Sequence, residues 1–147
     1  MGNAANTVIS HIGICTTDAA HSIRFYTEAL GFVHDRSIDE IGAPFDALTE
    51  MPGATFGAHY LTCSGVTIEL IEFHNRDVQG PSERRPMNQL GFTHMTLIVD
   101  DVQAAAERVA AAGGKVHPET QIDSPFGPMV FCTDPDGVRI ELIQGGN

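Results

Sequence analysis

The chain has 147 residues, of which 42% are hydrophobic and 18% charged, a balance typical of one globular domain or two small fused modules. Its formal net charge of −11 argues against nucleic acid and anionic membrane surfaces as partners, because phosphates would be repelled. No apolar run approaches the roughly 20 residues of a membrane helix, and the start, MGNAANTVIS, lacks the features of a signal peptide. We therefore expect a cytoplasmic protein whose Cys15, Cys63 and Cys132 remain reduced.

The first half of the chain predicts one strand, one helix and three further strands. A strand is expected over residues 8–15, and Asp18 then stands where a helix N-cap belongs. The helix covers residues 19–30, with Ile23, Tyr26 and Leu30 at helical spacing, and Gly31 ends it. The remaining strands are expected over residues 32–38, 58–63 and 66–73.

The second half predicts the same elements in the same order. After a strand over residues 92–99, Asp101 is the expected N-cap of a helix over residues 102–112, which Gly113 and Gly114 end. Three strands follow over residues 115–118, 129–133 and 138–144. The turn sequence DPDG at residues 134–137 separates the last two.

The two halves are therefore an internal repeat. The stretch from His11, HIGICTTDAAHSIRFYTEALGFVHD, aligns with HMTLIVDDVQAAAERVAAAGGKVHP from His94, and GVTIELI aligns with GVRIELI. We expect an α+β fold of two tandem βαβββ modules. The predicted organisation is a single domain over residues 1–147, with module one at about 7–74, a connector at 75–90 and module two at about 91–145.

Each repeated run places one glutamate among aliphatic residues, where an unpaired carboxylate is costly. Since strand side chains alternate between faces, each module offers one histidine from its first strand and one glutamate from its last. For any one such residue, an ordinary hydrogen-bonded or solvated role would be the better explanation. The repetition instead favours a divalent cation site in which the metal offsets the cost of the glutamates. Its predicted ligands are His11, Glu69, His94 and Glu141.

From SHIGICTTDAAHSIRFYTEALGF to FCTDPDGVRIELIQ, the chain resembles the vicinal oxygen chelate superfamily. This superfamily includes glyoxalase I, methylmalonyl-CoA epimerase, extradiol dioxygenases, and fosfomycin and bleomycin resistance proteins. The resemblance implies that the two modules form an open, curved mixed sheet around a metal cleft. It also implies one divalent metal ion (Ni, Co, Zn, Mn or Fe) and, often, a homodimer. The ligand order is similar to that of bacterial glyoxalase I. However, Cys15 and Phe73 stand where glyoxalase I typically has an arginine and an asparagine, which puts a glutathione substrate in doubt.

The resemblance implies a metal-dependent lyase or isomerase that moves a proton on a small carbonyl or carboxylate substrate chelated to the metal. Glu141 or Glu69 would act as the base. His59, Arg84 and Arg85 are candidate substrate-binding residues. An exposed histidine on a strand is the simpler interpretation of His59, and a solvated pair in a loop is an equally simple interpretation of Arg84 and Arg85.

Two other functions remain open from the sequence. An Fe(II)-dependent dioxygenase of the same superfamily usually has two histidines and one carboxylate, so a fourth protein ligand counts against it. A metal-free protein that binds a drug in its cleft typically lacks the ligand set. The sequence also leaves open whether the modules pair within one chain or across a dimer.

Overall fold

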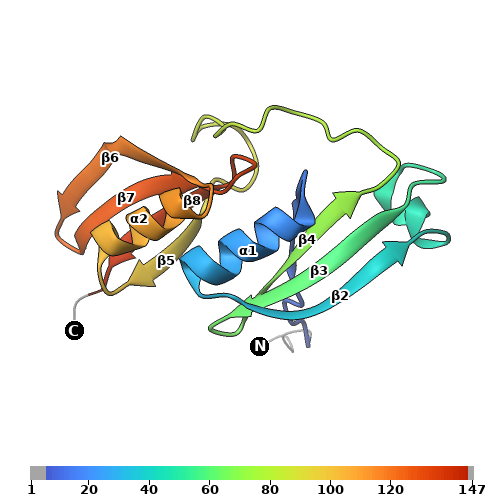
Figure 1. The fold of residues 1–147 in the computed structure, drawn as a ribbon, viewed down its shortest axis with the longest axis horizontal. Helices are drawn as coiled ribbons and strands as arrows, with labels where there is room; N and C mark the ends of the chain where they lie inside the picture. The colour runs from blue at the N-terminus through green and yellow to red at the C-terminus, as the bar shows by residue number, and fades with distance from the viewer. Residues whose placement is uncertain (1–5, 146–147) are drawn as a thin grey trace, which may run out of the picture.

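The computed structural model describes residues 6–145 and contains two copies of one βαβββ unit (Figure 1). The first module consists of β1 (Ile12–Cys15), α1 (Ala19–Leu30), β2 (Val33–Ile41), a short 3-10 helix η1 (Phe45–Thr49), β3 (Phe56–Cys63) and β4 (Val66–Phe73). The second consists of β5 (Met95–Val99), α2 (Val102–Ala111), β6 (Lys115–Ser124), β7 (Gly127–Thr133) and β8 (Arg139–Gln144).

Each module has its own four-stranded mixed sheet. The strand orders are β1-β4-β3-β2 and β5-β8-β7-β6, with parallel pairing only between the first and last strand of each module. This confirms the predicted fold of tandem βαβββ modules. It also leaves β1 and β5 as edge strands of separate sheets.

Both predicted helix caps are present. The Asp18 carboxylate accepts a hydrogen bond from the backbone N–H of His21 at 2.8 Å, and Asp101 accepts one from that of Ala104 at 2.9 Å. Each bond satisfies a backbone donor in the first helical turn. Gly31 follows α1 in the left-handed region, at a φ of 74°, where a side chain would be unfavourable. The helix boundaries therefore agree with the sequence prediction to within one residue.

Strand β6 is longer than predicted, because Pro118 does not end it. The pairing with β7 is interrupted between His117 and Ile122 and then resumes. Within this irregularity the Thr120 hydroxyl accepts a hydrogen bond from the Phe131 N–H at 2.9 Å, replacing a bond of the regular ladder. The proline marks a bulge of the strand rather than its end.

A single hydrophobic core joins the modules through their helices, which lie side by side and pack on each other (Figure 1). Phe25 and Tyr26 of α1 and Val109 of α2 are fully buried in it. The Tyr26 hydroxyl also donates to the Asp134 carboxylate at 2.9 Å, in the turn between β7 and β8. Because the helices form the contact, the sheet faces opposite them are left open.

The connector crosses from the end of β4 to the second module (Figure 1). It is fixed there by Arg139, which donates to the backbone carbonyl of Arg85 at 2.6 Å. Gly137 has a φ of 88°, and a Cβ on it would lie 2.6 Å from the backbone of Glu83, so this close approach requires glycine. No helix within residues 6–145 is long and apolar enough to cross a membrane.

Candidate metal centre

The first pair of predicted ligands, the first ligand pair, is His11 and Glu69. His11 directly precedes β1, and Glu69 lies on the neighbouring parallel strand β4, opposite Gly13. The Nε2 atom of His11 is 3.1 Å from Oε2 of Glu69. The other ring nitrogen, Nδ1, is 3.0 Å from the Ser10 hydroxyl. This contact orients the ring so that Nε2 and the carboxylate point to one place.

The second ligand pair is His94 and Glu141, in the equivalent positions of the second module. The Nε2 atom of His94 is 3.6 Å from Oε2 of Glu141, and its Nδ1 atom is 2.9 Å from the Thr93 hydroxyl. The Thr96 hydroxyl donates to Oε2 of Glu141 at 2.8 Å. The sequence repeat therefore corresponds to a geometric repeat.

Tyr60 distinguishes the first pair. It is the cross-strand partner of Glu69, and its hydroxyl donates to Oε1 of Glu69 at 2.6 Å. This hydrogen bond, followed by burial, raises the pKa of the Tyr60 phenol, because the proton is held by the carboxylate. The Tyr60 ring also meets His11 edge to face at 5.5 Å, and the Arg36 guanidinium lies 4.3 Å from its centre.

Phe131 takes the place of Tyr60 in the second module, as the cross-strand partner of Glu141. Its ring meets His94 edge to face at 5.3 Å, and Arg139 lies 5.0 Å from its centre. Each ligand pair thus rests on an aromatic ring backed by an arginine. Only the first ring carries a hydroxyl, so only Glu69 is bound by its partner on the antiparallel strand, whereas Glu141 is bound by Thr96, its partner on the parallel strand β5.

The donor chemistry fits a divalent metal ion. Two imidazole nitrogens and two carboxylate oxygens suit the transition metals named above. Yet among residues 6–145 no three His, Cys, Asp or Glu side chains lie close enough together to hold an ion. The structure brings together the members of each pair but not the two pairs, because the modules meet through α1 and α2 rather than through β1 and β5.

One cavity lies beside each sheet, and that of the first sheet adjoins its ligand pair. This cavity has a volume of about 790 Å³ and is lined by His11, Tyr60 and Glu69 and also by Phe73. Cys15 is the other residue that departs from the glyoxalase I pattern, and it is exposed. The pKa of its thiol is raised, first by the part of the thiol that is buried and then by the charge of Asp136.

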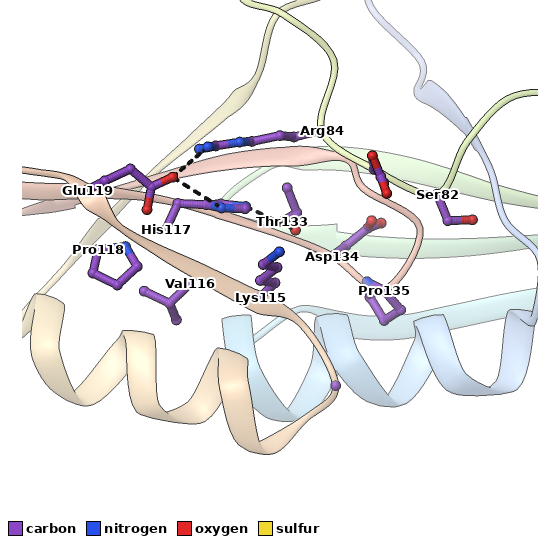
Figure 2. A pocket seen from close by; sticks show the side chains of 12 residues that line it. Ser82, Arg84, Lys115, Val116, His117, Pro118, Glu119, Thr133, Asp134 and Pro135 are labelled. Carbon is purple, nitrogen blue, oxygen red and sulfur yellow. Dashed lines mark hydrogen bonds and ion pairs between the residues drawn. The ribbon is translucent and has the colours of Figure 1, made fainter.

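The other cavity, of about 700 Å³, lies beside the second sheet and contains Arg84 (Figure 2). The Arg84 guanidinium is paired with Glu119, whose carboxylate is also 3.8 Å from Nδ1 of His117. The neighbouring Arg85 donates to the backbone carbonyl of Phe92. Both predicted substrate-binding arginines are therefore bound to protein partners, and the lining of this cavity does not include the second ligand pair.

His59 lies on the face of the first sheet opposite the ligand pair. It is the cross-strand partner of the buried Leu70, one position from Tyr60, and its Nδ1 is 2.7 Å from the Ser37 hydroxyl. As a candidate substrate-binding residue, His59 would have to face the cleft, and this expectation is wrong. Side chains alternate along β3 (Phe56–Cys63), so His59 points to the helix side of the sheet when Tyr60 points to the cleft. If the predicted strands 58–63 and 66–73 are paired across their turn, Tyr60 rather than His59 lies opposite Glu69.

Comparisons with known proteins identify the family and the fold of this chain. The Glyoxalase/Bleomycin resistance protein/Dioxygenase superfamily matches residues 8–142. The chain is 31% identical over 143 residues to a probable lactoylglutathione lyase of Vibrio parahaemolyticus, covering 95% of this chain and 92% of that protein. It is also 31% identical to a probable chloroplastic lactoylglutathione lyase of Arabidopsis thaliana, over 92% of this chain but only 35% of that protein's length. A glyoxalase family protein from Bacillus cereus has the same fold, with a TM-score of 0.81 at 15% identity over 96% of this chain and 97% of its own.

Proposed function

Because this chain belongs to the glyoxalase/bleomycin resistance protein/dioxygenase superfamily, we propose that it is a metal-dependent lyase or isomerase. One metal site would combine the first ligand pair of one chain with the second ligand pair of another copy. The observation that carries this proposal is the presence of two His–Glu pairs on sheet faces that do not meet within the chain. A twofold homodimer would then hold two identical sites.

The sheet edges next to the ligand pairs support this assembly. Val8 and Ile9, just before β1, are each 86% exposed, and Phe92 and Ile98, at β5, are 82% and 77% exposed. Unpaired edge strands with exposed apolar side chains favour association with another chain. Apposing β1 of one copy and β5 of the other would cover these residues and bring the two ligand pairs together.

The bound metal would act as a Lewis acid on two adjacent oxygens of the substrate. The glutamates are placed for different roles. Oε1 of Glu69 accepts from Tyr60 and its Oε2 faces His11, so both oxygens are engaged. In Glu141 only Oε2 accepts a hydrogen bond within the described residues, from Thr96. We assign Glu141 as the base, with Oε1 taking a proton from the substrate carbon and returning it to a neighbouring carbon, and Glu69 as the fixed ligand.

The substrate we propose is a small carbonyl or carboxylate compound with two adjacent oxygens, and not the hemithioacetal of glutathione. Phe73 places an aromatic ring in the cavity beside the first pair, and Cys15 offers no positive charge. A lost charge partner for a buried carboxylate typically costs about 2–5 kcal/mol. An ultraviolet assay of lactoylglutathione formation should therefore show weak turnover; a catalytic efficiency of about 10⁴ M⁻¹s⁻¹ or more would contradict this.

A mixing experiment tests the shared site without a known substrate. We expect His11→Ala and His94→Ala proteins each to lose tight cobalt binding. Unfolded and refolded together, they would form mixed dimers with one intact site, restoring about a quarter of the wild-type cobalt sites, counted by absorbance. Elemental analysis of the purified protein would identify its own metal and distinguish an enzyme from a metal-free binding protein.

The matched control is a mixture of His11→Ala with Glu69→Ala, in which both lesions lie in the first module. Every site in a mixed dimer of these two would be incomplete, so no cobalt binding should return. Equal recovery in both mixtures, or no recovery in either, would contradict a site shared between chains. We also expect a cytoplasmic location, in keeping with the free thiols of Cys15, Cys63 and Cys132.

A further inference from the structure

The cavity beside the first ligand pair includes His11 and Glu69 in its lining, and most of its other lining residues are apolar. Its volume of about 790 Å³ falls within the range of small-molecule sites. The walls come from four elements: β2, η1, β3 and β4. Their apolar residues include Ile38, Ile41, Phe45, Leu48, Phe56 and Phe73.

The charges in this cavity are negative. Glu40 and Glu69 are the ionisable acids in its lining, which contains no lysine or arginine. Glu40 is bound to Nδ1 of His74 at 2.8 Å, and Glu69 is bound to Tyr60. Arg36 lies over the Tyr60 ring and is not part of the lining. A carboxylate or phosphate of a ligand would lose its hydration among the apolar walls and meet no positive lining residue, so the walls favour an uncharged group.

The segment that carries η1 has no counterpart in the second module and brings two exposed apolar side chains to the cavity. Phe45 is 54% exposed and Leu48 82% exposed. Exposed side chains of this size gain free energy when an apolar partner covers them. On the second sheet the cavity lining is instead polar and charged, with Arg84, Lys115 and His117.

We infer that this cavity holds an uncharged aliphatic or aromatic group of the substrate, whose two-oxygen end reaches the first ligand pair. The inference rests on the proposed metal site, and it specifies the substrate class: a two-oxygen chelating head joined to an apolar tail. The adjacency of His11 and Glu69 to the apolar walls fixes the order of the two parts. Phe73, which departs from the glyoxalase I pattern, belongs to the wall that receives the tail.

Alkyl hydroxamates test this inference, because each offers two adjacent oxygens to a metal and an apolar chain of chosen length. The dissociation constants of acetohydroxamate, butyrohydroxamate and hexanohydroxamate would be measured from the visible absorbance of the cobalt-loaded protein. We expect binding to tighten by about two- to fourfold for each added methylene group. Phe45→Ser and Leu48→Ser should each weaken this dependence on chain length while leaving acetohydroxamate binding unchanged.

Phe126→Ser and Leu90→Ser are the matched controls, since Phe126 and Leu90 are also exposed, at 80% and 96%, but do not line the cavity. Both should keep the wild-type dependence on chain length. If affinity does not rise with chain length, or if the cavity variants behave as the controls do, the inference is overturned, and a second copy of the chain covers these side chains instead. If acetohydroxamate itself does not change the cobalt spectrum, the proposed metal site fails rather than the cavity.

Discussion

The first module places a tyrosine hydroxyl on its ligand glutamate, whereas the second places a threonine hydroxyl there. Tyr60 reaches Glu69 from the neighbouring antiparallel strand, and Thr96 reaches Glu141 from the parallel one. The cavities beside the two sheets also differ: the first adjoins its His–Glu pair and has mainly apolar walls, whereas the second is charged and does not include its pair. One βαβββ frame can therefore supply the same two ligands twice while their surroundings diverge.

This difference suggests that the two modules have different roles in the proposed shared site. The first module would fix the metal and hold the apolar end of the substrate. The second would supply the movable carboxylate. Within each chain the two modules are joined by one hydrophobic core to which both helices contribute. Changes in matched positions of the two modules can break or sharpen this comparison.

The largest effect is expected on the rate of proton transfer, when each ligand glutamate is replaced by glutamine in turn. Glu141→Gln should slow proton transfer by about 10²–10⁴-fold, because an amide cannot act as the base. Glu69→Gln should slow it less and act mainly by weakening metal binding. The measurement is deuterium exchange from solvent into hydroxyacetone, followed by NMR, with cobalt content determined for each variant.

Two outcomes would contradict this assignment. Equal loss of exchange in the two variants at equal cobalt content would show that the glutamates are interchangeable. A larger loss in Glu69→Gln would reverse their roles. Glu141→Asp is the control for the position, since it keeps a carboxylate but shortens its reach.

The shared core predicts that the modules unfold together. Phe25→Ala should lower the free energy of unfolding by about 3–5 kcal/mol, because it leaves a cavity between α1, α2 and the sheets. Denaturant unfolding followed by circular dichroism should still give one transition. Phe126→Ala, at an exposed turn, should change stability by at most about 0.5 kcal/mol. Two separate transitions in the Phe25 variant would show that the modules are independent.

Removing the two hydroxyls compares how the modules support their ligand glutamates. Tyr60→Phe should weaken metal affinity by about tenfold to a hundredfold, because it frees a carboxylate oxygen that the phenol holds at 2.6 Å. Thr96→Val removes a longer bond of 2.8 Å and should have a smaller effect. Competition with a chelator measures both affinities, and a larger effect of Thr96→Val would contradict the greater constraint on Glu69.

The repeat made much of this structure predictable. Asp18 and Asp101 cap the helices as expected, and both His–Glu pairs form, because cap residues and strand alternation are local signals. The arrangement of the modules was not predictable, since it depends on which apolar face packs on which. The face of His59 follows from the pairing of β3 with β4, which sets His59 opposite the buried Leu70 and Tyr60 opposite Glu69.

Strand boundaries with irregular pairing were also beyond the sequence signals. In β6 the hydroxyl of Thr120 substitutes for a backbone partner, so the strand continues past Pro118. The predicted hairpin, paired across its turn, would have placed Tyr60 opposite Glu69, but the hydrogen bond and ring contact by which Tyr60 supports the pair required the structure. Strand alternation thus predicted which residues lie together in each pair, whereas their surroundings depend on packing.

The smallest effect we predict is a pH dependence of stability that arises from His117. This side chain is 5% exposed, and burial, followed by the charge of Arg84, lowers its pKa. Lys115 and Arg139 also lower the pKa, whereas Glu119 raises it. As the pH falls below the ordinary histidine value of about 6.5, the unfolded chain takes up a proton before the folded one does, so stability falls with pH.

Denaturant unfolding of metal-free protein between pH 7.5 and 5.5 should show a shallower fall of the unfolding free energy in His117→Gln than in the wild type. Every other titrating group is common to the two proteins and no metal is present. Parallel curves of unfolding free energy against pH would therefore contradict this role of His117.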